Sequence, residues 1–180
     1  MARVRWPWER RAALPPALAS ALGPNEQVQV VAQLTGGESL AASRFGLWLA
    51  SGEIAVRWNW ERVSKARLTA RTLTVVAAEE VAVTPDGIVV LQDLPPREFE
   101  LAGTSGLTDA VHARVRRSVA ASRYLSWPGA GGWVVLRRVP GRDGLTRQIR
   151  LDSGGDAGAP GFLRAVVDTA EDLEAELLGD

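Results

Sequence analysis

Short apolar stretches separated by tight turns run through residues 27–101, and they constrain the fold more than any other feature of the sequence. In Gln27–Thr35, apolar and polar residues alternate, which is typical of a half-buried strand. Gly36-Gly37 predicts a hairpin turn, because glycine tolerates the positive φ that such turns require. Further turn signals at Ser51-Gly52 and at residues 85–87 indicate about seven short antiparallel strands, as in a barrel or a sandwich.

The predicted strand Glu53–Trp60 lies at the centre of this run. Side chains alternate between the two faces of a strand, so Val56, Trp58 and Trp60 share one face. Two tryptophans on one face provide a large apolar area, and we expect this face to lie in the core. Farther along, β-branched residues predict two separate strands, Leu73–Ala77 and Val81–Thr84.

The apolar pattern becomes helical after residue 101. Four apolar residues at intervals of four predict a single helix over Gly106–Arg123, which would cover an open end or face of the strands. These residues are Leu107, Val111, Val115 and Val119. The other predicted elements are a short helix at Pro16–Leu22, a linker at Trp127–Gly132, a hairpin formed by Trp133–Val139 and Thr146–Leu151, and a last helix at Pro160–Leu178.

Two segments resemble the strand openings of bacterial pleckstrin-homology-like (PH-like) domains. Ser43–Leu49 begins with a small residue and an arginine, and Trp60–Val63 has the aromatic-acidic-basic-aliphatic step that opens a later strand. Asn59 stands where these families usually have a proline. The resemblance implies an α+β fold in which about seven antiparallel strands form a split β-barrel covered by a helix. The trailing hairpin and amphipathic helix resemble those of actinobacterial proteins of this type.

Three parts are expected along the chain. Residues 1–26 form an N-terminal arm with a short helix, and Trp6 and Trp8 of this arm could pack on the body. Residues 27–123 form the PH-like domain. Residues 124–180 form an extension of a β-hairpin and a C-terminal helix, which we expect to pack on the same body.

The composition excludes several kinds of chemistry. The chain has no cysteine, which excludes disulfides, thiolate metal sites and a cysteine nucleophile. Its one histidine, His112, has no catalytic partner in the sequence and cannot by itself build a usual zinc cluster. A hydrolase that uses Glu61 with Asp86 or Asp93 is the remaining enzymatic alternative. We therefore expect a protein that is no enzyme and has no cofactor or metal. No stretch reaches the roughly 20 apolar residues of a membrane span, and we expect a cytoplasmic location.

The formal net charge is zero, but the charges are unevenly distributed. Residues 152–180 contain eight acidic residues and one arginine, whereas residues 103–150 contain nine arginines and two acidic residues. We expect these regions to face each other or to be solvated. The alternative is a basic surface that binds the phosphates of nucleic acid or acidic lipid. The candidate anion-binding residues are Arg114, Arg116, Arg117, Arg123, Arg137, Arg138, Arg147 and Arg150.

These features favour a non-catalytic interaction or scaffolding module that binds a protein partner. The alternative is an anion-binding module for nucleic acid or acidic lipid, which would use the arginine-rich helix and hairpin. The apolar stripes of the two longer predicted helices would also suit a homodimer, because they could be buried within one chain or against a second copy.

Overall fold

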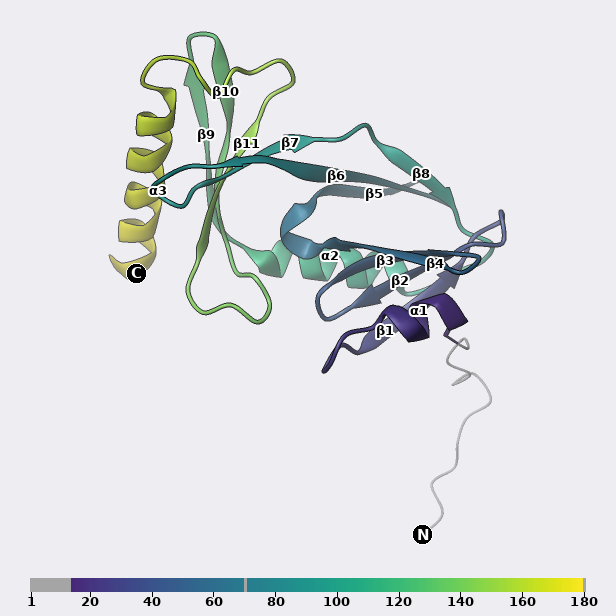
Figure 1. Cartoon of the computed structure of the whole chain (residues 1–180). Coiled ribbons are helices and arrows are strands. Elements are labelled where there is room, and N and C mark those ends of the chain that lie inside the picture. Colours follow the sequence, from purple (N-terminus) through teal and green to yellow (C-terminus); the bar gives the residue numbers. More distant parts are fainter. Residues whose placement is uncertain (1–13, 70, 180) are drawn as a thin grey trace.

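The computed structural model describes residues 14–69 and 71–179. These residues form an α+β fold with two β-sheets and three α-helices (Figure 1). The part of the predicted arm that carries Trp6 and Trp8 lies outside the described residues. None of the described helices combines the length and the apolar character needed to cross a membrane.

The first sheet contains four antiparallel strands in the order β1-β2-β3-β4. Turns with positive φ at Gly37 and Gly52 lie at the positions that the sequence predicts. Helix α1 (Pro16–Ala21) packs on the outer face of this sheet, where Leu18 is buried beside Trp48. The strands are β1 (Val28–Gln33), β2 (Ser39–Ser43), β3 (Gly46–Ser51) and β4 (Ile54–Asn59).

The second sheet is mixed and curls into a half-barrel, with the strand order β5-β6-β7-β11-β10-β9 and with β8 paired to β6. Only β7 and β11 run parallel among its described neighbours. A 3-10 turn, η1 (Trp60–Arg62), joins β4 to β5. The strands are β5 (Val63–Thr69), β6 (Thr72–Val83), β7 (Val89–Asp93), β8 (Arg97–Glu100), β9 (Val119–Trp127), β10 (Ala130–Arg137) and β11 (Thr146–Leu151).

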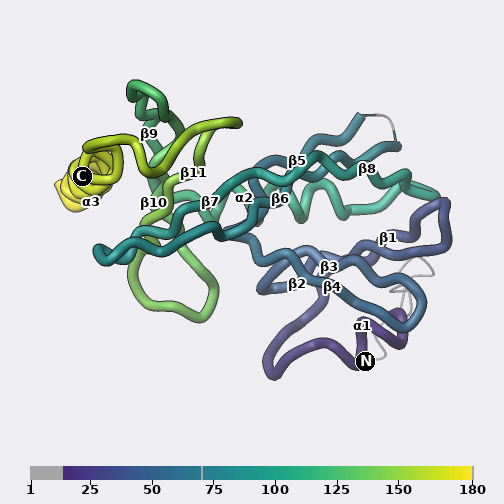
Figure 2. Tube along the Cα trace, turned by 45° about the horizontal axis from the view of Figure 1, so that its top comes forward, coloured from purple at the N-terminus to yellow at the C-terminus, as the bar shows by residue number. Residues whose placement is uncertain are grey.

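Strand β6 links two parts of the molecule, as Figure 2 shows. Its first half pairs with β5 and β8, and its second half pairs with β7. Residues 94–96, which include Pro95 and Pro96, separate β7 from β8, because proline cannot donate to a strand ladder. The prediction of two separate strands at Leu73–Ala77 and Val81–Thr84 is wrong, since β6 is a single strand of 12 residues. Pairing with three neighbours keeps it extended through the exposed Glu79 and Glu80.

Two hydrophobic cores lie on either side of this link. The N-terminal core fills the space between the first sheet, strands β5, β6 and β8, and helix α2 (Leu107–Ser118). It contains Trp60, and α2 contributes Leu107 and Val111 as predicted. The C-terminal core lies between helix α3 (Phe162–Gly179) and strands β7, β10 and β11.

The predicted hairpin and last helix are confirmed as β10, β11 and α3. Two predictions between them are wrong. Helix α2 ends at Ser118 instead of Arg123, and β9 begins at the next residue. Residues 127–132 form no linker, but a turn at Gly129 and the start of β10. The helical spacing of apolar residues extends to Val119, yet ladder pairing with β10 satisfies the backbone of β9 and decides its conformation.

Candidate functional site

Strand β4 forms an edge of the first sheet, because β3 is the one strand among the described residues that pairs with it. At the end of this ladder, the N–H of Trp60 donates to the carbonyl of Phe45 over 3.3 Å. Hydrogen-bonded and non-hydrogen-bonded pairs alternate along antiparallel strands, so the even-numbered residues of β4 bond to β3. The backbone N–H and C=O groups of Ala55 and Arg57 therefore point away from the sheet, whereas Asn59 caps the 3-10 turn η1.

Apolar side chains are exposed along this edge. Ile54 is 67% exposed and Val56 is 49% exposed, while Trp58 is half-buried. The ring of Trp58 packs against Phe99 of β8, with 6.1 Å between the ring centroids. The expectation that the face with Val56, Trp58 and Trp60 lies in the core therefore holds for Trp60 and not for Val56, which no further strand of the described chain covers.

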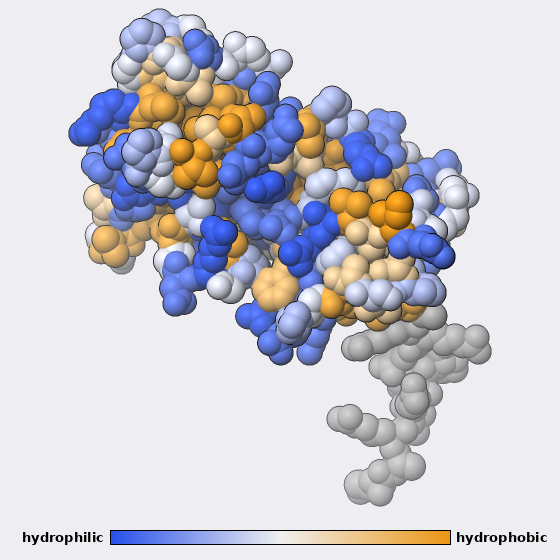
Figure 3. Space-filling model, in the orientation of Figure 1, coloured by the Kyte–Doolittle hydropathy of each residue, from blue (hydrophilic) through white to orange (hydrophobic). Residues whose placement is uncertain are grey.

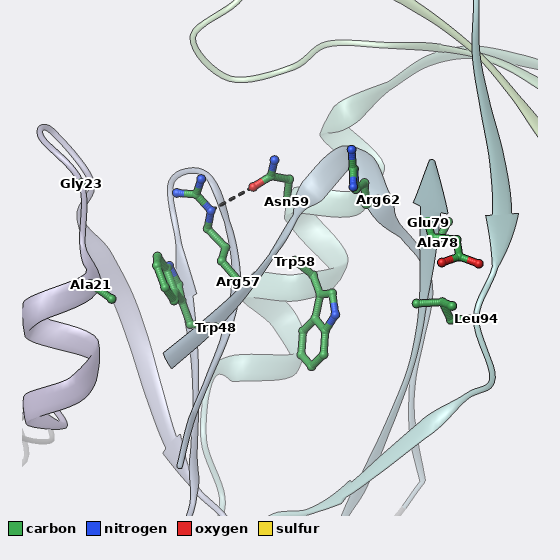
Figure 4. A pocket seen from close by; sticks show the side chains of 10 residues that line it. All are labelled: Ala21, Gly23, Trp48, Arg57, Trp58, Asn59, Arg62, Ala78, Glu79 and Leu94. Carbon is green, nitrogen blue, oxygen red and sulfur yellow. Dashed lines mark hydrogen bonds between the residues drawn. The ribbon is translucent and has the colours of Figure 1, made fainter. Parts of the chain in front are cut away.

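A groove of about 520 Å³ borders the edge of β4, and we call it the β4 groove. Figure 4 shows Arg57 on one wall and Ala78 and Leu94 on the opposite wall, with Trp58 between them. A smaller cavity of about 110 Å³ shares Trp58 and Leu94 with the groove and is lined also by Pro95. On the face drawn in Figure 3, hydrophobic atoms gather over the first sheet and over the C-terminal core, with hydrophilic atoms between them.

Arg97 of β8 lies at the small cavity and carries a charge that no described carboxylate neutralises. Its guanidinium stacks on the rings of Trp58 and Phe99, 5.2 Å from each centroid. The two arginines that line the β4 groove are paired, since Arg57 bonds Glu26 and Arg62 bonds Glu80. Stacking on aromatic rings holds the Arg97 charge in place and leaves its N–H groups available to a ligand.

The segment beside the β4 groove is held by a buried carboxylate. Glu26 accepts hydrogen bonds from the Ser43 hydroxyl at 2.5 Å, the Trp48 indole N–H at 2.9 Å and the Arg57 guanidinium at 2.8 Å. Burial alone would raise the pKa of Glu26, but these hydrogen bonds and the Arg57 charge outweigh it and lower that pKa below its ordinary value. The loop between α1 and β1 is therefore anchored to the outer face of the first sheet.

The structure separates the eight predicted anion-binding arginines into three groups. Arg123 pairs with Asp172 and Glu176 of α3, and Arg147 pairs with Glu174. At these two arginines the arginine-rich and acidic regions face each other, which is one of the two arrangements expected from the sequence. Four arginines form no ion pair with a described residue. They are Arg114, Arg116, Arg117 and Arg138.

The remaining two, Arg137 and Arg150, are buried between the two cores. Arg137 is 3% exposed and donates to the Ser118 hydroxyl at 2.5 Å. Burial, followed by the charge of Arg150, lowers the pKa of Arg137 to about 10. Arg150 bonds the Ser64 hydroxyl and lies 3.7 Å from Asp93. Arg137 Nε and Arg150 Nη2 are buried without a described hydrogen-bond partner, so this junction retains unsatisfied donor groups.

Three of the candidate catalytic groups, His112, Asp93 and Glu61, have structural partners. His112 Nε2 lies 2.9 Å from the Ala66 carbonyl of β5, so the ring joins α2 to that strand. Asp93 accepts a 2.6 Å hydrogen bond from Ser64, and Glu61 accepts one from Asn59. In the described residues, no group of three His, Cys, Asp or Glu side chains is arranged to hold a metal ion.

Comparisons with known protein families, with curated proteins and with solved structures found no match for this chain. The candidate site therefore depends on geometry alone. Sequence reasoning missed Arg97 and Ile54, although the alternation of Ile54, Val56 and Trp58 already places these three side chains on one strand face. The missing information was that β4 ends its sheet and that β8 returns opposite it.

Proposed function

We propose that this chain is a non-catalytic interaction module that binds a protein partner at the β4 groove. The observation that carries the proposal is an unpaired strand edge with exposed Ile54 and Val56 beside a groove of about 520 Å³. An exposed apolar strand edge pairs readily with another polypeptide, and proteins normally avoid leaving one open. An edge kept open beside a groove is well suited to partner binding.

A PH-like split barrel is our proposed fold assignment. The order β4-β3-β2-β1 continues through a bridge between Leu34 and Leu101 to the end of β8, and then through β6 to β5. Helix α2 follows these strands and covers the core between them. This arrangement supports the resemblance that the sequence gives. The cytoplasmic location and the homodimer stay predictions.

The proposal is tested by affinity capture from a lysate of the organism that encodes the chain. The test variant is Val56→Asp, and the matched control is Val83→Asp, which changes another exposed strand valine at the far end of β6. The wild type and Val83→Asp should capture the same protein after nuclease treatment, and Val56→Asp should lose it. Equal capture by all three forms would contradict the proposal.

A second candidate function is binding of nucleic acid or acidic lipid at α2. Burial lowers the pKa of Arg114, and the charges of Arg117 and Arg44 lower it further. The three positive groups therefore lie near one another. Clustered guanidiniums favour phosphate. Double-stranded DNA and vesicles with anionic lipid should each be tested with the wild type and with the double variant Arg114→Gln and Arg117→Gln. Binding that does not weaken as salt rises would exclude this function.

A further inference from the structure

We propose that the β4 groove takes an extended peptide segment with an acidic residue, and that this segment joins the first sheet as a fifth strand beside β4. The inference rests on the proposed function and specifies the chemistry of the partner. Three features of the groove and its borders carry it, namely the backbone of β4, the apolar side chains along that strand and the charge of Arg97 at the adjoining small cavity.

The backbone of β4 specifies an extended ligand. The N–H and C=O groups of Ala55 and Arg57 point into the space that a neighbouring strand would occupy, and neither residue bonds the backbone of another described element there. A bound strand would satisfy these groups in the alternating manner of an antiparallel or parallel ladder. Because β4 has six residues, the paired part of the ligand is about as long.

The side chains of β4 specify apolar residues at every second ligand position. Ile54, Val56 and Trp58 share the face of β4 that borders the N-terminal core. Side chains of a neighbouring strand on the same face would contact them directly. The cavity of about 110 Å³ next to Trp58 and Pro95 is open to one of these side chains. Burying the exposed surface of Ile54 and Val56 supplies the apolar part of the affinity.

Arg97 specifies the acidic residue and its position. Its guanidinium is exposed at the cavity, is fixed over two aromatic rings and forms no ion pair with any described residue. A carboxylate in the ligand could accept two parallel hydrogen bonds from it. The far wall carries the exposed Glu79, which would repel an acidic group placed there. The acidic residue must therefore lie at the Arg97 end.

Charge also argues against the N-terminal segment of the chain as the occupant. Residues 1–13 contain four arginines and one glutamate, and this net positive charge does not match the unpaired Arg97. A second copy of the chain could pair β4 with β4, but β4 contains no acidic residue and would supply no carboxylate to Arg97. A separate acidic segment is the occupant that satisfies all three features.

The experiment selects ligands from a phage-displayed library of random decapeptides on the purified full chain. The enriched sequences should alternate apolar residues and carry Asp or Glu near one end. A synthetic peptide of the enriched sequence is then titrated by fluorescence polarisation. Arg97→Glu should weaken its binding at least about tenfold, and replacing the acidic residue of the peptide with lysine should restore binding to this variant. Arg116→Glu, on the exposed side of α2, is the matched control and should leave the affinity unchanged.

Backbone pairing is tested separately by N-methylation of alternate peptide amides. One of the two N-methylated series should lose binding and the other should retain it, because only alternate N–H groups face β4. Selected peptides without an acidic preference, equal binding to Arg97→Glu, or equal tolerance of both N-methylated series would overturn the inference. A dimer that Val56→Asp dissociates in sedimentation would also overturn it. Partner capture that depends on Val56 while no such peptide is selected would leave the proposed function standing and reject this inference alone.

Discussion

Strands β4 and β9 both end a sheet, but their surroundings differ. Helix α3 packs along β9, and Arg123 of that strand forms ion pairs with two acidic residues of the helix. Helix α1 contacts β4 as well as β3, but from the face of the sheet, where Leu18 is buried beside Trp48. Strand β4 nevertheless carries two exposed β-branched residues, Ile54 and Val56.

Strand β5 ends the second sheet opposite β9, and a helix contacts it as well. Helix α2 contacts β5, and His112 bonds the carbonyl of Ala66 in that strand. The exposed side chains of β5 include Lys65 and Arg67, and such charges discourage pairing with other chains. The sheet ends at β9 and β5 are thus contacted by helices or carry charged side chains. The edge of β4, in contrast, is apolar and has no described strand beside it. This difference is the basis of the binding that we propose at the β4 edge.

Removing the anchor of the covering helix should have the largest effect on stability. Phe162, the first residue of α3, is fully buried in the C-terminal core. Phe162→Ala should lower the free energy of unfolding by about 3–5 kcal/mol, because it removes a large buried side chain and leaves a cavity. Guanidinium unfolding followed by circular dichroism measures this change. Leu178→Ala on the same helix is the control and should cost under about 0.5 kcal/mol, since Leu178 is 88% exposed.

Removing the buried carboxylate that anchors the loop between α1 and β1 should have an intermediate effect on stability. Glu26→Gln keeps the size of the side chain but removes the charge that accepts hydrogen bonds from Ser43, Trp48 and Arg57. We expect a loss of about 2 kcal/mol at neutral pH, which is typical of hydrogen bonds to a charged group. Glu53→Gln, in the exposed turn before β4, should change stability little.

The contribution of Glu26 should also depend on pH. Its pKa is lower in the folded chain than in the unfolded chain, so the folded state binds fewer protons. The stabilisation is therefore fully present above the unfolded value of about 4.3 and is lost as the pH falls through the lower folded value. The difference in unfolding free energy between wild type and Glu26→Gln should shrink from pH 7 to pH 3. A difference that is constant over this range would contradict the role assigned to the buried carboxylate.

Breaking the ion pairs of the covered edge should have a smaller effect. Arg123→Gln removes the contacts to Asp172 and Glu176, which are both largely exposed. Exposed ion pairs contribute about 0.2–1 kcal/mol, and the loss should decrease further in 1 M salt. Arg138→Gln, an exposed arginine without an ion pair to a described residue, is the control. A loss several times larger would show that electrostatics, and not the apolar core, holds α3 on β9.

Charging the open edge should affect stability least. Val56→Asp changes an exposed side chain, so the free energy of unfolding should stay within about 0.5 kcal/mol of the wild type. Leu49→Asp, which changes the cross-strand neighbour of Val56, should be severely destabilising, because Leu49 is buried in the N-terminal core. Thermal unfolding of the two variants makes the comparison. Equal losses would mean that Val56 belongs to the core.

Local signals in the sequence predicted the strands of the first sheet, α2 with its apolar stripe, and α3. Glycine-containing turns fix where strands end, and these turns depend only on neighbouring residues. The end of α2 could not be predicted this way. The four-residue spacing continues from Val115 to Val119, and only pairing with β10, which is distant in the sequence, converts residues 119–127 into a strand.

The candidate site was less predictable than the elements that form it. Alternation places Val56 and Trp58 on one side of a strand, but it does not tell whether another strand covers that side. The order of strands decides this, and β4 ends its sheet. The arginine patch shows the same limit, because the fold buries Arg137 and pairs Arg123 with α3 although both belong to one basic stretch of sequence.

Amide hydrogen exchange of the free chain tests the central claim most directly. If the edge of β4 is open, the N–H groups of Ala55 and Arg57, which point outward, should exchange at least about tenfold faster than those of Val56 and Trp58, which bond to β3. This alternation should be independent of protein concentration, because no second copy covers the edge. Equal protection of all four amides in the free chain would show that the β4 edge is already covered, and it would contradict the account.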